Sequence, residues 1–186
     1  MSSGKTESRP EPISGLHHFA YRCRDAEETR HFYEDILGLP LTMLVRAEHV
    51  PSTGEFCPHV HIFFQLSEGA YLAFFDLGDN EKALPSPNTP AWVNHLALEV
   101  ASKEALLNMK AHLEANGIDV LGVTDHEVIE SIYFFDPNGI RLELAVRTAT
   151  PDELQPYGRE AHGLLRSWVI EKASRLGQAG AASHDS

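Results

Sequence analysis

LHHFAYRC at residues 16–23 and VNHLALEV at residues 93–100 are two stretches of this sequence that read alike. Their alignment matches His18 with His95 and Ala20 with Ala97. In each stretch the large apolar residues alternate with other residue types, which predicts a short β-strand. The chain therefore carries an internal repeat, and the repeat is the starting point for its fold.

A helix start signal follows each of these strands. Asp25, with Glu28 three residues later, forms a capping box, and Ser102 is the expected cap of the second helix. Apolar residues then recur at helical spacing until Gly38 in the first copy and Gly117 in the second, where a residue free to adopt positive φ ends the helix.

Three extended runs follow each helix, so the repeated unit is βαβββ. They are predicted at residues 41–46, 59–66 and 70–76 in the first copy, and at 119–122, 127–135 and 140–146 in the second. The sequence thus predicts an α+β fold in which two βαβββ modules form a curved mixed sheet, with an additional C-terminal helix.

The predicted boundaries follow shifts in composition along the chain. We expect a disordered leader (1–12), a first module (13–78), a linker (79–91), a second module (92–147), a C-terminal helical extension (148–177) and a disordered tail (178–186). Within the extension, apolar residues at helical spacing predict a helix at about 159–176, which we interpret as a lid or a dimer-packing element.

Charge and cysteine content exclude several classes of partner. The formal net charge is −12, from 27 acidic and 15 basic residues, which argues against a nucleic-acid or anionic membrane surface. Because residues 1–12 are polar, we expect them to be neither a signal peptide nor a membrane span. Cys23 and Cys57 are too few for a disulfide framework, so we expect reduced thiols in the cytoplasm.

Three side chains of the metal-ligating type fall on one face of the predicted sheet. Alternate residues of a strand face opposite sides, so His18, His95 and Glu143 point away from the helices and toward the concave face. A single histidine on a strand is usually only a polar residue on a solvated face, and His17 competes with His18 because a shift of one residue reverses the face. The match with His95 favours His18. Two imidazoles and a carboxylate suit Fe(II) or Mn(II) in oxygen chemistry.

Two further segments connect this pattern to a known group of proteins. FYEDILGL at 32–39 and FDPNG at 135–139, together with the paired modules and the His/His/Glu set, resemble the vicinal oxygen chelate (glyoxalase/bleomycin resistance/dioxygenase) superfamily. The resemblance covers about residues 15–147 and implies a fold in which the curved sheet surrounds a metal site.

A more specific signature points to one branch of that group. His126, Tyr133, the turn at 136–139 and Glu143 occur in the order found in type I extradiol dioxygenases. This resemblance implies an Fe(II) enzyme, with Mn(II) as the alternative metal, that cleaves a small catechol-type aromatic substrate with O₂. Glu143 is then a metal ligand, Tyr133 hydrogen-bonds a substrate oxygen and His126 steadies an oxygen-derived intermediate. The resemblance also allows a homodimer.

The sequence departs from that branch at one point. Extradiol enzymes place an acid–base histidine shortly before the second metal histidine, and residues 79–94 contain none. His59 and His61, which share an inward parity with Phe63, are the candidate substitutes, or they simply line the substrate cavity.

Three alternative functions stay open. A metal-dependent lyase or isomerase of the glyoxalase type uses a fourth ligand, but the corresponding position here is Ala73, which cannot coordinate a metal. A thiol transferase of the fosfomycin-resistance type needs only two histidines and a glutamate. A non-catalytic, ligand-binding drug-resistance protein typically lacks the metal triad.

Overall fold

The computed structural model describes residues 14–84 and 86–182, and their side chains as far as residue 175. The segment 1–12, expected to be a disordered leader, lies outside the described residues. The first module contains β1 (His18–Cys23), α1 (Ala26–Arg30) with its π-helical continuation η1 (His31–Ile36), β2 (Leu41–His49), β3 (Phe56–Gln65) and β4 (Tyr71–Asp76). The second contains β5 (Leu96–Glu99), α2 (Lys103–Ala115), β6 (Leu121–Asp125), β7 (Ile129–Phe135) and β8 (Arg141–Arg147).

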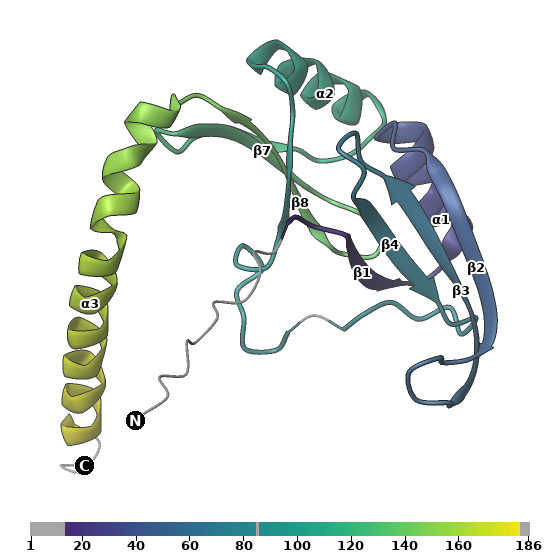
Figure 1. Cartoon of the computed structure of the whole chain (residues 1–186), viewed down its shortest axis with the longest axis horizontal. Coiled ribbons are helices and arrows are strands. Elements are labelled where there is room, and N and C mark those ends of the chain that lie inside the picture. Colours follow the sequence, from purple (N-terminus) through teal and green to yellow (C-terminus); the bar gives the residue numbers. More distant parts are fainter. Residues whose placement is uncertain (1–13, 85, 183–186) are drawn as a thin grey trace, which may run out of the picture. The chain divides into compact units, whose positions relative to one another are not determined.

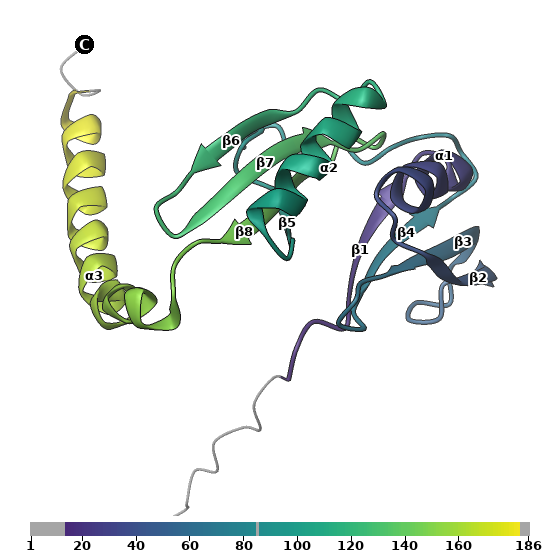
Figure 2. The same cartoon turned by 90° about the horizontal axis from the view of Figure 1, so that it is seen from above.

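Each module forms a four-stranded sheet, and the two sheets share one topology. The strand order is β1-β4-β3-β2 in the first and β5-β8-β7-β6 in the second, so equivalent strands occupy equivalent places (Figures 1 and 2). In the first sheet β1 pairs with β4 in parallel, whereas β3 pairs antiparallel with β2 and β4. The predicted α+β fold of two βαβββ modules is confirmed, with one sheet contributed by each module.

The helix caps follow the predicted sequence signals. The carboxylate of Asp25 accepts a hydrogen bond from the backbone nitrogen of Glu28 at 2.7 Å, and the hydroxyl of Ser102 accepts one from Ala105 at 3.1 Å. Gly38, with a φ of +74°, follows the end of the first helix. These bonds satisfy amide groups that the first turn of a helix leaves without intrahelical partners.

Aromatic side chains form the core between the first helix and its sheet. Tyr33 is fully buried, and its ring lies 5.2 Å from that of Phe64 and 4.8 Å from that of Phe74. Burial of large aromatic side chains contributes roughly 2–3 kcal/mol each relative to exposure. This packing holds η1 against β3 and β4.

The chain divides into two compact units whose boundaries differ from those of the modules. One contains the described residues up to Leu96, with Asn116–Asp119 and Phe134–Leu142. The other contains Ala97–Ala115, Val120–Tyr133 and the chain from Glu143 onward. The turn between β7 and β8 thus belongs to the unit that holds the first module.

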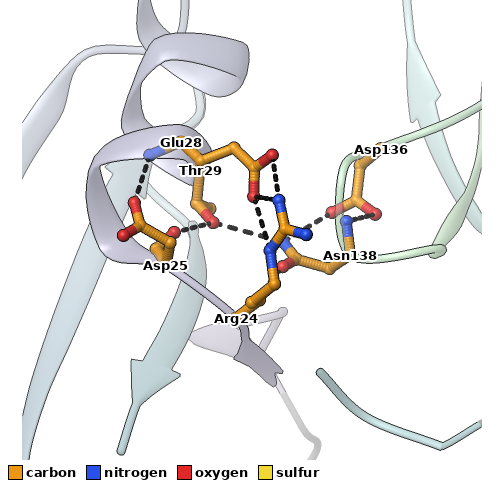
Figure 3. A network of polar contacts seen from close by, with 6 residues as sticks. All are labelled: Arg24, Asp25, Glu28, Thr29, Asp136 and Asn138. Carbon is orange, nitrogen blue, oxygen red and sulfur yellow. Dashed lines mark hydrogen bonds and ion pairs between the residues drawn. The ribbon is translucent and has the colours of Figure 1, made fainter. Parts of the chain in front are cut away.

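Polar contacts explain why this turn belongs there (Figure 3). The side-chain oxygen of Asn138 accepts a hydrogen bond from the backbone nitrogen of Arg24 at 2.9 Å, and its amide donates to the hydroxyl of Thr29 at 3.2 Å. Asp136 accepts hydrogen bonds from the backbone of Asn138 and of Ile140. Because Thr29, Asp136 and Asn138 are all buried, each needs such partners to offset its loss of water.

The C-terminal helix α3 spans Pro151–Ala182 and is longer than the predicted 159–176. Thr150 and Glu153 form a reciprocal capping box, in which the Thr150 backbone nitrogen donates to Glu153 at 2.8 Å and the Glu153 nitrogen donates to the Thr150 hydroxyl at 3.4 Å. Pro151 occupies the first helical position, where a missing N–H costs nothing. Residues 178–182 of the expected tail are part of α3, and 183–186 lie outside the described residues.

Candidate functional site

Glu143 is held on β8 as a buried carboxylate. Only 3% of its surface is exposed. Its Oε1 atom accepts a hydrogen bond from the hydroxyl of Ser131 at 2.5 Å and another from the hydroxyl of Tyr133 at 3.2 Å. A buried carboxylate without donors is costly, so these two hydroxyls stabilise Glu143 in its buried position.

Strand parity places these side chains together. Ser131 and Tyr133 lie two residues apart on β7, which neighbours β8 in the sheet. The intervening Ile132 and the following Phe134 are fully buried core residues, 0% and 1% exposed. The alternation of β7 therefore directs its apolar residues to the core and its hydroxyls to Glu143.

His126 extends this arrangement at the end of β6. Its Nε2 atom lies 2.7 Å from the hydroxyl oxygen of Tyr133. Tyr133 thus lies between an imidazole nitrogen and a carboxylate oxygen. While its hydroxyl donates to Glu143, its oxygen can accept a hydrogen bond from the tautomer of His126 that carries its proton on Nε2. The structure brings together three of the predicted site residues, His126, Tyr133 and Glu143.

His18 is the first residue of β1 and is exposed. Its Nδ1 atom lies 2.7 Å from Nδ1 of His17. Its ring centroid lies 6.2 Å from that of His61 and 6.0 Å from that of Phe63, both on β3. The sheet of the first module therefore gathers His18 with two of the three predicted cavity-lining residues.

His61 packs closely with its aromatic neighbours. Its ring stacks on Phe75 with centroids 3.6 Å apart and planes 18° apart, and the centroid of Phe63 is 4.1 Å away. Among the residues that the structure describes, its buried Nε2 atom has no hydrogen-bond partner. Burial first, and then the nearby His18 and His59, lower the pKa of His61 to about 4, so its ring is neutral near pH 7.

His59 and His95 both contact nearby backbone. Nδ1 of His59 lies 2.6 Å from the carbonyl oxygen of Cys57, and its ring centroid is 5.5 Å from that of Phe75. His95 directly precedes β5 and is exposed, and its Nδ1 atom lies 3.0 Å from the carbonyl oxygen of Val93. Each contact engages the Nδ1 atom of its ring and so favours the tautomer that carries a proton there.

The predicted metal triad stays a prediction. In the described part of the chain, no group of three or more His, Cys, Asp or Glu side chains is arranged to hold a metal ion. The donor types of His18, His95 and Glu143 fit a divalent ion such as iron or manganese. The buried, doubly hydrogen-bonded carboxylate of Glu143 also fits the role of a ligand supported by its neighbours.

The pattern of the sequence did not assign every residue of this site. Ser131 has the inward parity of Tyr133, but parity alone does not reveal that it contacts Glu143. Asn138 was identified only as part of a turn, although it bonds to Arg24 and Thr29. Contacts between residues so far apart in sequence leave no local signal.

The unit that holds the first module contains a cavity of about 300 Å³. Its walls come from β1, the segment between the modules and the chain around the β7–β8 turn, with Tyr21, Lys82 and Arg141 among them. Arg141 donates a hydrogen bond to the carbonyl oxygen of Trp92 at 2.7 Å. None of the three predicted ligands is among the residues that line this cavity.

No helix in the described ranges 14–84 and 86–182 has the length and apolar character needed to cross a membrane.

Two curated relatives are dioxygenases by name. The chain is 28% identical over 164 residues to the 2,2',3-trihydroxybiphenyl dioxygenase of Sphingomonas paucimobilis, covering 85% of this chain and 46% of that protein. It is 24% identical over 158 residues to the biphenyl-2,3-diol 1,2-dioxygenase of Paraburkholderia xenovorans, covering 84% and 44%. The chain therefore spans less than half the length of these relatives.

Solved structures share the fold. A glyoxalase/bleomycin resistance protein/dioxygenase domain from Frankia sp. EAN1pec has a TM-score of 0.60 and 18% identity, over 73% of this chain and 99% of that one. A glyoxalase/dioxygenase from Nostoc punctiforme has a TM-score of 0.56 and 21% identity, over 79% and 100%. The lactoylglutathione lyase of Agrobacterium tumefaciens has a TM-score of 0.52 and 22% identity, over 73% and 96%.

The sequence also matches a protein family over residues 15–144, the range that contains both βαβββ modules. That match covers most of the chain and agrees with the repeated topology of the two sheets. The chain belongs to the Glyoxalase/Bleomycin resistance protein/Dioxygenase superfamily.

Proposed function

We propose that this chain is a metal-dependent dioxygenase that uses O₂ to cleave the aromatic ring of a small catechol-type substrate. The observation that carries the proposal is the hydrogen-bonded series His126–Tyr133–Glu143. These are the residues that the extradiol signature picks out. The names of the two dioxygenase relatives support the same reaction class. Because the chain spans less than half of either relative, its own activity needs a direct test.

His18, His95 and Glu143 are the proposed metal ligands, and Fe(II) is the proposed metal, with Mn(II) as the alternative. When bound, Fe(II) supplies open coordination positions and a redox-active centre at which an electron-rich aromatic diol and dioxygen react. A site with two imidazole ligands and one carboxylate ligand leaves more coordination positions open than a site with four protein ligands.

Tyr133 and His126 are the proposed proton-handling pair. The Tyr133 hydroxyl lies within hydrogen-bond distance of both His126 Nε2 and Glu143 Oε1. It can therefore pass a proton from a substrate hydroxyl to the imidazole without leaving its place. His59, His61 and Phe63 are proposed to line the substrate position, where the neutral ring of His61 and the face of Phe63 suit an aromatic ring.

One observation weighs against the four-ligand lyase or isomerase alternative. The residue of β4 equivalent to Glu143 is Ala73, which is fully buried and pairs with Ala20 of β1. A methyl group at this position supplies no ligand. The lyase among the structural neighbours shares the fold at 22% identity, which carries no information about the reaction.

An anaerobic purification followed by metal analysis and an oxygen-uptake assay tests the proposal. Iron in the protein, together with oxygen uptake and a yellow ring-fission product when catechols are supplied, is the expected result. Bound zinc or nickel without oxygen uptake would instead indicate lyase or thiol-transferase chemistry. A protein that takes up no metal under these conditions would be a ligand-binding member of the superfamily.

We also propose that the chain acts in the cytoplasm, on small molecules rather than nucleic acid or membranes, and that it forms a homodimer. The free thiols of Cys23 and Cys57 support a reducing compartment. The exposed apolar residues Leu165, Trp168 and Val169 of α3 support a packing role for that helix. Size-exclusion chromatography with light scattering tests the dimer.

A further inference from the structure

We propose that the cavity beside β1 is a binding site for a small aromatic carboxylate. The described residues that line it all belong to the unit that holds the first module, and the inference does not rest on the proposed metal site. The cavity volume of about 300 Å³ is at the lower end of the range of roughly 300–1,000 Å³ in which proteins bind small organic molecules.

The segment between the modules forms one wall of the cavity and is bonded at both ends. At its start, Arg22 of β1 pairs with Asp79 and donates a hydrogen bond to the backbone oxygen of Glu81 at 3.0 Å. At its end, Arg141 of β8 donates to the carbonyl oxygen of Trp92 at 2.7 Å. Because both ends of this wall are bonded to strands, the cavity is formed before a ligand arrives, as is usual for small-molecule sites.

The charged side chains that line the cavity are both cations. Among its described lining residues, Lys82 and Arg141 are charged and none is acidic, although the chain carries a net charge of −12. Asp136 is not one of the lining residues, and its carboxyl accepts hydrogen bonds from the backbone of Asn138 and Ile140. A concave site that carries charges of one sign concentrates ligands of the opposite sign, so this cavity favours an anion.

Three lining side chains offer hydrogen-bond donors to such an anion. In the part of the chain that the structure describes, the Tyr21 hydroxyl, the Lys82 ammonium and the Asn94 amide have no hydrogen-bond partner. Burial, and then the charge of Asp136, raise the pKa of Tyr21, so its hydroxyl keeps its proton near pH 7 and can donate. A carboxylate has about four acceptor sites and can satisfy these donors together.

The other part of the wall is apolar and suits an aromatic ring. Phe135 and Leu84 line the cavity and are 50% and 93% exposed, and Pro90 and Ile140 lie on the same wall. A ligand that covers exposed apolar side chains gains stability from the hydrophobic effect. An inorganic anion such as phosphate leaves them in water, whereas an aromatic carboxylate matches both the cations and the apolar residues.

The test is a calorimetric titration of the full chain, with a chelator present and benzoate as the probe. Benzoate is expected to bind at one site. Benzamide has the same ring without the charge, and acetate has the charge without the ring. Each is expected to bind at least about 10-fold more weakly than benzoate, because one of the two kinds of contact is lost.

Variants locate the binding in the cavity. Lys82→Gln should weaken benzoate binding about 3–10-fold, since it removes a charged donor. Tyr21→Phe keeps the ring but removes a neutral donor, so a decrease of about 2–10-fold is expected. The matched control is Lys172→Gln, which removes the same charge from an exposed lysine of α3 in the other unit. It should keep the affinity of the unaltered chain.

Several results would overturn the inference. Absence of saturable benzoate binding would remove the site, and equal affinities for benzoate and benzamide would show that the cations do not select a charge. Tighter binding of inorganic phosphate than of benzoate would contradict an aromatic carboxylate. Equal losses of affinity in Lys82→Gln and Lys172→Gln would place the binding outside the cavity. Because the chelator keeps metal out of the titration, none of these results bears on the proposed dioxygenase activity.

Discussion

The hydroxyl of Tyr33 donates a hydrogen bond of 3.0 Å to Oδ2 of Asp136, 103 residues further along the chain. Tyr33 lies on η1 and is fully buried, and Asp136 opens the β7–β8 turn. Burial is the largest influence on the carboxyl of Asp136 and raises its pKa, while the donors from Ile140, Asn138 and Tyr33 oppose that rise. The bond thus joins the aromatic core of the first module to the turn that leads into β8.

Tyr33→Phe should destabilise the chain, because it removes one donor from a buried carboxyl. We expect a loss of about 1–2 kcal/mol in the free energy of unfolding at pH 7. Because the pKa of Asp136 is raised, the folded state binds a proton at this carboxyl more readily than the unfolded state. The stabilisation that comes from protonating Asp136 is therefore largest below pH 4, and it declines as the pH rises through the pKa of Asp136 in the folded state. A neutral carboxyl loses less than a carboxylate when a hydrogen-bond donor is removed. The loss of stability in Tyr33→Phe should therefore be smaller near pH 4 than at pH 7. Urea denaturation at both pH values measures it, and Tyr157→Phe, at an exposed tyrosine, is the control that should change little.

Gly122→Ala should destabilise the second sheet. Gly122 has a φ of +109°, which side-chain-bearing residues rarely adopt, and an added Cβ would meet the backbone oxygen of Ser131 at 2.7 Å. Strain of this kind costs about 1–3 kcal/mol, which thermal unfolding detects as a lower Tm. Gly158→Ala is the matched control, because a Cβ there meets nothing within 4 Å and alanine favours a helix by about 1 kcal/mol. Equal Tm changes in the two variants would contradict this account.

The fold and part of this site could be predicted from the sequence because their signals are local. The cap at Asp25 and the glycine at 38 mark helix ends within a few residues, and strand alternation was enough to place Tyr133 on the side of Glu143. The early start of α3 also has a local signal, the capping box of Thr150 and Glu153. The apolar stripe, by contrast, predicts only the later turns of this helix.

The long-range contacts had no such signal. The amide of Asn138 donates to the hydroxyl of Thr29, 109 residues away, and nothing in either neighbourhood indicates the partner. Parity likewise gives the face of Ser131 but neither its distance to Glu143 nor the particular oxygen that it contacts. Sequence patterns fix which side of a strand a residue occupies, whereas hydrogen bonds depend on the packing of whole elements.

His61 should make the stability of the metal-free chain depend on pH. Its folded-state pKa is about 4, below the ordinary value of 6.5, chiefly because its ring is buried. The unfolded state therefore binds a proton first, and stability should fall as the pH drops from about 6.5 toward 4. His61→Gln should reduce this fall, as measured by urea denaturation with a chelator present. His162→Gln, at an exposed histidine of α3, should leave the slope unchanged, and an equal effect of both variants would argue against a special role for His61.

His18→Ala, His95→Ala and Glu143→Ala should each abolish retention of iron, because every proposed ligand supplies one of only three protein donors. Metal analysis after anaerobic desalting measures the retained iron, and circular dichroism verifies the fold. His17→Ala is the control. It changes the neighbouring imidazole, whose Nδ1 lies 2.7 Å from that of His18, and it should keep its iron. Iron retained in one of the three variants would remove that residue from the ligand set, and loss in His17→Ala alone would transfer the role from His18 to His17.

Tyr133→Phe should keep iron and lower kcat, because Ser131 still supports Glu143 while the proton path to His126 is lost. General acid–base groups contribute about 10²–10⁴-fold to a rate, so a decrease of at least 100-fold in catechol-dependent oxygen uptake is expected. His126→Gln removes the other end of the pair and should lower kcat to a similar level, and the double variant should be no worse than either single variant, because the two residues act as one unit. If the decrease in kcat of the double variant equals the product of the two single decreases, Tyr133 and His126 act separately. If kcat is unchanged in Tyr133→Phe, the 2.7 Å contact between Tyr133 and His126 has a structural role only.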